Sequence, residues 1–379
     1  MPKDEAAAAL GANGKLLFKP DTQINRHFML KRLISSGGFG QVYSGVNINT
    51  GHLVAIKAES IDAKIPLLRI EASCLEALNI AIRRNRRFFK GPIPNYYGYG
   101  ETHAVRYMVM DLFGKNIREL KKGTKNDCFS ITTSLWIMKK MITALKYLHR
   151  LGWIHRDVKP ANFCVGLQLQ GKQELFLVDF GMARHFISRN GVMKMRRESS
   201  SFHGTVRYAS LTTHRHQDMS RYDDLWSVYY ITVENMTGQL PWRFVNEKTE
   251  VEKMKETIDL LMQQFGTEPN PPASLLVLYR NLCHASFYHE PKYDYIVTEI
   301  SLDLARRNFF AGSLLDWQIP EKLSEHNEYE NMEEVHQEEL ASCERKKVKG
   351  SSRNNVKYEC TKELENDHSY YFIQQCEHF

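Results

Sequence analysis

Apolar and polar residues alternate in short runs from about residue 28 to about residue 110. Turn residues separate these runs: a glycine-rich stretch follows FMLKRLI, and NINTG divides QVYSGV from HLVAIKAES. Alternation over roughly four to eight residues between such turns is typical of strands joined as β-hairpins. The pattern therefore predicts consecutive hairpins, and RYMVMD predicts a further short strand.

Later stretches have the spacing of amphipathic helices. Over residues 68–78, three apolar residues recur near helical intervals: Ile70, Leu75 and Leu78. SLWIMKKMITALKYLHRLG carries one apolar stripe, which consists of Leu135, Met138, Ile142, Leu145 and Leu148. Gly152 stands where a helix C-terminal cap is expected. Helical spacing continues to about Trp317, so the pattern predicts an α+β fold with the strands mainly first.

The two ends of the chain differ in composition from the middle. Residues 1–25 are rich in Ala, Gly and Lys, and we expect them to form a flexible lead-in. Residues 319–379 are charged in blocks, acidic through Glu339 and then basic in ERKKVKG. Because charged segments with few apolar residues cannot bury enough surface to fold, we expect a poorly ordered tail.

Composition narrows the class of protein. The 51 Lys and Arg exceed the 44 Asp and Glu by 7, an excess that favours phosphate groups or acidic partners but is too small to indicate nucleic-acid binding. The seven cysteines form no CxxC pair, which argues against a disulfide framework or a zinc site. We find no signal-peptide pattern and no apolar run of the roughly eighteen residues that span a bilayer. We expect a monomer in the cytoplasm, with the nucleus as the alternative, and no membrane partner.

The first hairpin turn is glycine-rich. Its sequence, SSGGFGQV, follows the pattern G-x-G-x-x-G-x-V with Ser35 in the first glycine position, where we expect serine to tolerate a positive φ poorly. Gly37 and Gly40 still allow the backbone to approach a nucleotide. In dinucleotide-binding folds such glycines open a helix, whereas a second strand follows here. Glycines followed by a strand favour a β-hairpin that covers the phosphates of a nucleotide. The alternative is an ordinary hairpin.

A lysine ends the apolar run VAIK. Lys57 is either an edge-facing residue or a charge directed inward at phosphates. An inward ammonium group requires a partner, because burying an unpaired charge costs too much free energy. Glu71 on the next predicted helix is a candidate partner, and Leu75 one turn later is expected to face the same interior. The pair would hold the lysine against the α- and β-phosphates of ATP.

The stretch WIHRDVKPANF concentrates polar groups directly after the second predicted helix. Phosphate transfer needs a carboxylate beside the acceptor hydroxyl, a cation at the γ-phosphate and oxygen ligands for Mg2+. Asp157 suits the first task and Lys159 the second. Asn162 and Asp179 offer the metal ligands. Asp179 follows the apolar run LFLV, 22 residues (179 − 157) after Asp157, so that two loops can meet at one edge of a small sheet.

HRDxKxxN and DFG stand in this order behind a correctly placed lysine, and together they resemble the signatures of eukaryotic protein kinases over roughly residues 26–318. The resemblance implies a bilobal fold, with a small, mainly antiparallel β lobe and one key helix over about 26–113. A larger, mainly helical lobe would follow over about 114–318. ATP and Mg2+ are the implied cofactors. HRDVK looks like a serine/threonine kinase, and Thr205 in HGTVRYAS would bond near Asp157 and Lys159.

The same resemblance implies a nucleotide-binding set. Met110 would guard the back of the ATP pocket, and residues 111–114 would form the hinge. The set consists of Ser35, Gly37, Gly40, Val42, Ala55, Lys57, Glu71, Met110, Asp111, Phe113 and Cys164. Cys164 departs from the aliphatic residue that is usual beneath adenine. Because neither Ser35 nor Cys164 replaces a catalytic group, we expect an active enzyme.

A narrower resemblance lies after the activation segment. No Ala-Pro-Glu follows it. GTVRYAS, SRYDDLW and VENMTGQLPW stand there instead, and they are similar to the casein kinase I superfamily, most of all to its tau-tubulin kinase branch. That family implies Asp224 as an anchor on the central helix of the large lobe. It also implies protein substrates whose Ser or Thr lies near acidic or phospho-primed residues, or substrates of the cytoskeleton.

Basic residues near this segment are candidates for that preference. The family implies an anion site of Arg207 and Lys253, and Arg156 with Arg184 is a second candidate. Arginine suits phosphate because its planar fork makes bidentate bonds. Alternatively, Arg156 and Arg207 only fasten the activation segment. The three serines at 199–201 are either phosphorylation sites or an ordinary polar loop.

Two other classes of function compete with an active kinase. A pseudokinase scaffold would share the fold, but its usual mark is loss of the lysine, aspartate or asparagine, and this sequence keeps all of them. A cytoskeletal binding protein would depend on the charged tail more than on catalysis. The kinase reading is favoured because it alone explains why the polar groups occur together.

Overall fold

The computed structural model describes residues 16–37, 40–84, 91–167, 173–188, 190–265 and 271–319, without the side chains of Lys125 and Met262. The chain divides into two compact units, residues 1–319 and residues 320–379, and every described residue belongs to the first. The predicted tail, apart from Ile319, and residues 1–15 of the predicted lead-in lie outside the described residues. So do Gly38 and Phe39 of the glycine-rich turn.

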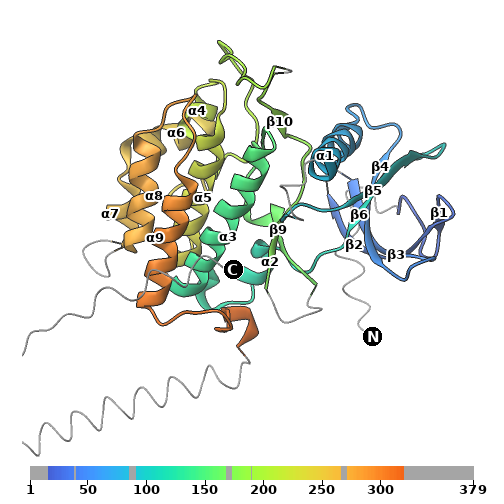
Figure 1. The fold of residues 1–379 in the computed structure, drawn as a ribbon, viewed down its shortest axis with the longest axis horizontal. Helices are drawn as coiled ribbons and strands as arrows, with labels where there is room; N and C mark the ends of the chain where they lie inside the picture. The colour runs from blue at the N-terminus through green and yellow to red at the C-terminus, as the bar shows by residue number, and fades with distance from the viewer. Residues whose placement is uncertain are drawn as a thin grey trace, which may run out of the picture. The chain divides into compact units, whose positions relative to one another are not determined.

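An antiparallel sheet forms the first part of the fold (Figure 1). Its strands are β1 Gln23–Ile24, β2 Phe28–Gly37, β3 Gly40–Asn47, β4 Leu53–Ser60, β5 Tyr96–Glu101 and β6 Val105–Asp111, in the spatial order β1-β2-β3-β4-β6-β5. The predicted hairpins are therefore confirmed. Successive side chains of β4 point to opposite faces: Val54 and Ile56 join a cluster with Tyr43 and Tyr107, whereas Ala55 faces the main core.

The described part of the predicted lead-in, residues 16–25, contacts this sheet, which corrects the prediction of flexibility for these residues. Phe18 is buried, and its backbone N–H donates to the Tyr43 hydroxyl at 3.1 Å. The Leu17 N–H donates to Gln41 Oε1 at 2.8 Å, and β1 pairs with β2. The apolar run Leu16-Leu17-Phe18 is too short to show a helix or strand periodicity, so the sequence pattern could not reveal this docking.

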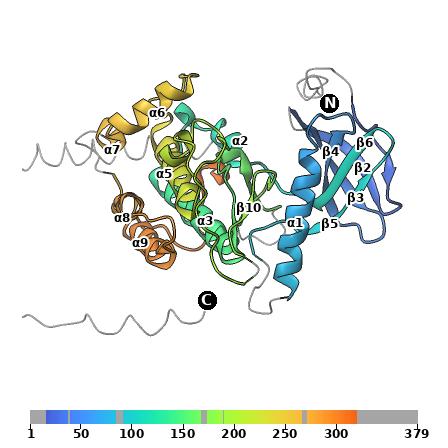
Figure 2. The same ribbon diagram turned by 90° about the horizontal axis from the view of Figure 1, so that it is seen from above.

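Helix α1 (Leu67–Arg84) lies along one side of the sheet, as Figure 2 shows. It is longer than the predicted span of 68–78. Leu75 and Leu78 are fully buried, as predicted, but Ile70 is 49% exposed, so its place in the predicted stripe is wrong. The buried face passes instead through Leu68 and Glu71, which directs the Glu71 carboxylate inward with the apolar side chains.

The rest of the described chain is mainly helical. Its helices are α2 Ile117–Lys121, α3 Ile131–Arg150, α4 Leu211–His214, α5 Arg221–Thr237, α6 Lys248–Thr257, α7 Leu260–Phe265, α8 Ala273–Cys283 and α9 Tyr293–Arg306. Its short strands are β7 Trp153–Ile154, β8 Phe163–Val165, β9 Leu175–Leu177 and β10 Arg184–His185, which pair as β8 with β9 and β7 with β10. None of the helices in the described residues combines the length and apolar character needed to cross a membrane.

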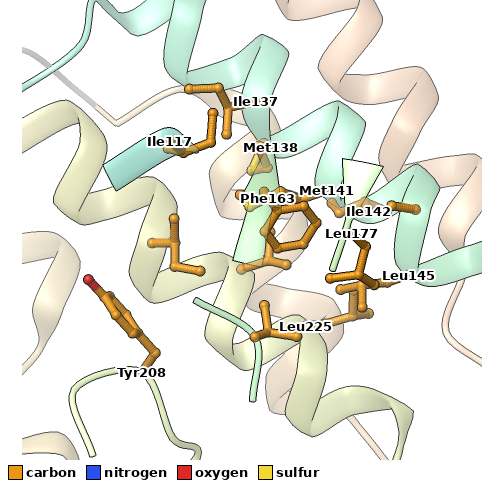
Figure 3. Packing of buried hydrophobic residues seen from close by; sticks show 14 of the residues in the cluster. Ile117, Ile137, Met138, Met141, Ile142, Leu145, Phe163, Leu177, Tyr208 and Leu225 are labelled. Atoms are coloured by element: carbon orange, nitrogen blue, oxygen red, sulfur yellow. The ribbon is translucent and has the colours of Figure 1, made fainter. Parts of the chain in front are cut away.

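Helix α3 is the centre of this part. It packs on α5, α9 and β9, and all five residues of its predicted stripe are fully buried. Figure 3 shows Met138, Met141 and Ile142 of α3 around Phe163 of β8, with Leu177 of β9 beside them. Ser130 caps the helix by accepting from the Thr133 N–H, and Gly152 adopts φ +85° just past its end. This core fixes the strands and loops that carry the candidate site.

Candidate active site

Three charged side chains from separate parts of the chain meet beside the inner face of the sheet. Lys57 Nζ of β4 lies 2.6 Å from Glu71 Oε2 of α1 and 3.4 Å from Asp179 Oδ1 after β9. Burial opposes the charge on Lys57, but the two carboxylates outweigh it and raise the pKa of its ammonium group. Burial likewise opposes the charge on Asp179, yet Lys57 and Lys159 hold its pKa below the ordinary range. The arrangement keeps Lys57 and Asp179 charged.

A buried carboxylate of α5 shapes the loop that follows β7. Asp224 accepts from the backbone N–H groups of His155 and Arg156, each at 2.8 Å, and lies 2.8 Å from His149 Nε2. Arg156 adopts φ +68°, a left-handed conformation that these two hydrogen bonds hold in place. The His149 contact, with the two N–H donors, lowers the pKa of Asp224 despite complete burial. Asp224 is thus an anchor of the loop, as the resemblance implied.

The same loop presents Asp157 with both carboxylate oxygens engaged. Lys159 Nζ donates to its Oδ2 at 2.5 Å, and the Thr205 hydroxyl donates to its Oδ1 at 2.8 Å. Asp157, Asp179 and Lys57 line one cavity, together with Glu71. The predicted catalytic set of Asp157, Lys159 and Thr205 is therefore brought together by the fold, next to the charged group around Lys57.

Asn162 joins the two loops. Its Nδ2 donates to the Asp157 carbonyl at 2.9 Å, and its own carbonyl accepts from the Val178 N–H at 2.9 Å. The side-chain Nδ2 of Asn162 is therefore engaged, and its backbone carbonyl ties the loop to the residue directly before Asp179. Within the described ranges no group of three or more His, Cys, Asp or Glu side chains could hold a metal ion. Two oxygen ligands still fit Mg2+, which commonly binds through one or two side chains with phosphate oxygens and water.

The glycine-rich hairpin differs from expectation at its first position. Ser35 pairs with Val42 directly after a register shift between Leu33 and Ser35, and it has no positive φ, so the expected backbone penalty at this serine is wrong. Gly37 pairs with Gly40, which adopts φ +110°. A Cβ on Gly40 would lie 2.1 Å from the Ala58 carbonyl oxygen. Gly40 therefore meets a steric requirement that no other residue could satisfy without a shift in the backbone.

The predicted hinge residues lie where the sheet joins the helical part. Ala55 of β4 is paired with Met110 of β6, and Val42 with Lys57. The Gly114 N–H donates to the Val165 carbonyl at 2.8 Å, which brings residues 111–114 beside Cys164 of β8. Burial raises the pKa of the Cys164 thiol to about 12.

The side chains of Phe113 and Asp111 in this hinge contact other residues of the chain. Phe113 stacks on Phe176 with ring centroids 4.4 Å apart. Asp111 accepts from the Tyr97 hydroxyl at 2.6 Å and from the Asn95 N–H at 2.9 Å. The Asp111 side chain therefore fixes β5 against β6.

The predicted anion site of Arg207 and Lys253 is not assembled. Arg207 Nη1 lies 3.4 Å from Glu234 Oε1, and its Nη2 donates to the Arg243 carbonyl. Lys253 is exposed on α6, and no described contact joins it to Arg207. Arg207 thus serves the structural role that the sequence left open as an alternative. Glu234, which the sequence analysis did not single out, is the reason.

The second basic group is assembled, around Asp218, which the sequence analysis missed. Arg184 forms an ion pair with the fully buried Asp218 carboxylate, and Arg197 Nη2 donates to the same oxygen at 2.8 Å. Arg156 lies near but donates from Nε to the Met182 carbonyl. Burial, followed by the neighbouring Arg184 and Arg197, lowers the pKa of Arg156 to about 10. Arg184 and Arg197 thus share one carboxylate, and Arg156 adds a third positive charge near them.

Comparisons with known proteins agree with this geometry. The sequence model of the family described as Protein kinase domain matches residues 28–299. A protein of Dictyostelium discoideum named "Probable serine/threonine-protein kinase" is 32% identical over 305 residues, 80% of this chain and 58% of that protein. The chain therefore spans less than two thirds of that relative's length. The predicted bilobal fold is confirmed, and the chain belongs to the protein kinase family.

Proposed function

We propose that the protein is a serine/threonine protein kinase that transfers the γ-phosphate of ATP to hydroxyl groups of protein substrates. The observation that carries the proposal is the shared cavity in which Lys57, paired with Glu71, faces both Asp157 and Asp179. A fold that needed only stability would gain little from this group, since burying several charges together is seldom favourable. Perturbed charges in a cleft are typical of functional sites.

Each side chain has a distinct task in this proposal. Lys57 binds the α- and β-phosphates, and Glu71 holds its ammonium group in position. Asp157 accepts the proton of the substrate hydroxyl, since its carboxylate is oriented by Thr205 and Lys159. Lys159 then neutralises charge that develops on the γ-phosphate. Mg2+, held by Asn162 and Asp179, supplies positive charge to the phosphates when it is bound.

We assign the chain further to the casein kinase I superfamily and its tau-tubulin kinase branch. The support is the sequence GTVRYAS–SRYDDLW–GQLPW, in which Ser210 replaces the glutamate of Ala-Pro-Glu. In the fold, Ser210 Oγ donates to Asp223 Oδ1 at 2.6 Å, so the segment is fastened without that glutamate. Cytoskeletal proteins are accordingly one of the substrate classes to test, beside casein.

We propose a preference for acidic or phospho-primed substrates, and we place it at Arg156, Arg184 and Arg197 in place of Arg207 and Lys253. Arg184 and Arg197 against one carboxylate, with Arg156 near them, leave positive charge for a phosphate, which arginine binds by bidentate hydrogen bonds. The test compares transfer to a serine peptide with and without a neighbouring phosphoserine. Arg184→Gln should remove most of the advantage of the primed peptide and leave the plain peptide unchanged.

The kinase proposal is tested by measuring phosphate transfer from Mg-ATP to casein, followed by identification of the phosphorylated amino acid. Asp179→Asn removes one metal ligand and should reduce the rate roughly a thousandfold. The product should be phosphoserine or phosphothreonine. A wild-type protein that binds ATP with an affinity unaffected by Mg2+ and transfers no phosphate would favour the pseudokinase scaffold instead.

A further inference from the structure

Lys255 of α6 is a buried lysine that no catalytic role explains. Its side chain is 8% exposed, and its Nζ donates to two backbone carbonyls, Val206 at 2.8 Å and Ala209 at 2.6 Å. His214 Nε2 lies 3.3 Å away. An ammonium group has three N–H bonds, so these three acceptors satisfy it fully if His214 is neutral. Burial, with Lys255 next, lowers the pKa of His214 to about 4, which keeps the ring neutral.

The surroundings of Lys255 contain aromatic rings in place of a counter-ion. Nζ lies 4.9 Å from the ring centre of Tyr230 and 5.2 Å from that of Trp242. Among the described residues no carboxylate lies within ion-pair distance of this ammonium group. Ring faces attract a cation, but burying an ammonium group without a carboxylate still costs free energy. A leucine or methionine would avoid that cost but would leave the two carbonyls without a donor, so these hydrogen bonds are the feature to explain.

Those carbonyls belong to residues 205–209, in which every backbone carbonyl accepts a hydrogen bond. The Thr205 carbonyl accepts from the N–H groups of Tyr208 and Ala209. Trp242 Nε1 donates to the Arg207 carbonyl at 2.9 Å, and Ser227 Oγ donates to the Tyr208 carbonyl at 2.8 Å. Lys255 completes the set at the two remaining carbonyls.

The segment begins at the catalytic loop. Thr205 donates to Asp157, the carboxylate that receives the substrate proton in the proposed mechanism. The residues that follow Thr205 therefore start next to the place where the acceptor hydroxyl must bind. Lys255 holds their backbone at two points, one on each side of Arg207 and Tyr208.

We propose that Lys255 is a positioning residue for the protein substrate: it fixes the backbone of residues 206–209 so that the acceptor hydroxyl reaches Asp157. The inference rests on the proposed kinase function. It predicts that loss of the ammonium group weakens use of the protein substrate and leaves ATP binding unchanged, because no contact of Lys255 reaches Lys57, Asn162 or Asp179.

The experiment compares the wild-type chain with Lys255→Met, Lys255→Arg and Lys292→Met. Lys292 is an exposed lysine just before α9 and serves as a matched control. KM and kcat are measured for ATP and for a single-serine peptide. Lys255→Met should raise the KM for the peptide at least about tenfold, since two buried carbonyls lose their N–H donor, while the KM for ATP stays within about twofold. Lys255→Arg, which keeps N–H donors, should recover part of the peptide KM, and Lys292→Met should match the wild type.

Amide hydrogen exchange separates this inference from the kinase proposal. Residues 205–210 should exchange faster in Lys255→Met than in the wild type, whereas α3 should be unchanged, and this holds even if no phosphate is transferred. An unchanged peptide KM in a folded Lys255→Met protein, or equal changes in both KM values, would overturn the inference. A Lys255→Met protein that does not fold would also overturn it, because Lys255 would then support the whole helical part and not this segment.

Discussion

The hydroxyl of Thr205 donates a 2.8 Å hydrogen bond to Oδ1 of Asp157, across 48 residues of sequence. This bond links the loop that carries the proposed base to residues 206–209, which we propose to position the substrate. Removing the hydroxyl should let both parts shift. Thr205→Val, which keeps the shape, should reduce kcat/KM for a serine peptide about tenfold, since one hydrogen bond to a charged group is worth about 1.5–3 kcal/mol.

The control for this prediction is Thr205→Ser, which keeps the hydroxyl and should stay within about threefold of the wild type in the same peptide assay. If the valine and serine variants had the same kcat/KM, the hydrogen bond to Asp157 would have no part in catalysis.

Gly40 and Gly37 of the glycine-rich hairpin differ in the space around them. A Cβ on Gly40 would meet the Ala58 carbonyl oxygen at 2.1 Å, and its φ of +110° disfavours any side chain, whereas no described atom lies within 4 Å of a Cβ on Gly37. Gly40→Ala should therefore distort the flap and raise the KM for ATP about tenfold or more, by the roughly 1–3 kcal/mol of a strained backbone. Gly37→Ala should leave it within about threefold. Equal effects of the two variants, measured by ATP titration, would contradict this role of Gly40.

The residues that carry the proposed chemistry could be predicted from the sequence because they lie in short, contiguous motifs. Asp157, Lys159 and Asn162 share one loop, and Lys57 and Asp179 each end an apolar run. Of these residues, Lys57, Asp157 and Asp179 line one cavity in the folded chain. The helix stripe of α3 could be predicted for the same reason, since its period of 3.6 is local.

The supporting residues could not be predicted because their partners are distant in sequence. Arg207 is held by Glu234 and Lys255 by carbonyls 46 and 49 residues away. Sequence reasoning paired Arg207 with Lys253, but residues two apart on a helix point to different sides, and it is Lys255 that α6 directs into the protein. Asp218 was likewise missed, because a single aspartate in THRHQDMS gives no sign that arginines at 184 and 197 converge on it.

His214 gives the folded protein a specific dependence on pH. Burial and Lys255 lower the pKa of its ring from 6.5 to about 4. The unfolded chain therefore takes up a proton at this residue before the folded chain does, so stability is complete above about pH 6.5 and decreases as the pH falls toward 4. Between pH 7 and pH 5 the free energy of unfolding should fall by about 2 kcal/mol from this residue.

Urea-induced unfolding at the two pH values measures this loss. In His214→Gln the difference between pH 7 and pH 5 should be smaller than in the wild type by that amount, since glutamine does not titrate. Identical pH dependence in the two proteins would show that His214 is not held neutral by its surroundings.

Asp224, the anchor beneath the catalytic loop, gives a prediction for the stability of the protein. Asp224 accepts from the N–H groups of His155 and Arg156 and contacts His149, all in a buried place. Asp224→Ala should lower the free energy of unfolding by about 3–5 kcal/mol, because its three partners lose an acceptor. Asp224→Asn keeps one carbonyl oxygen and should lose less. Thermal unfolding of both variants checks the order, and an alanine variant as stable as the wild type would exclude the anchoring role.

The most direct test of the kinase function is the rate of phosphate transfer from Mg-ATP to a serine peptide by the wild type and by Asp157→Asn, with ATP affinity measured for both. Asp157 is placed as the proton acceptor and does not contact the partners of Lys57, so the variant should bind ATP within about threefold of the wild type. Its transfer rate should fall by roughly a hundredfold to ten-thousandfold, the contribution of a positioned base. A variant that transfers phosphate as fast as the wild type would contradict the assignment of Asp157, and a wild type that binds ATP but transfers nothing would contradict the proposed activity itself.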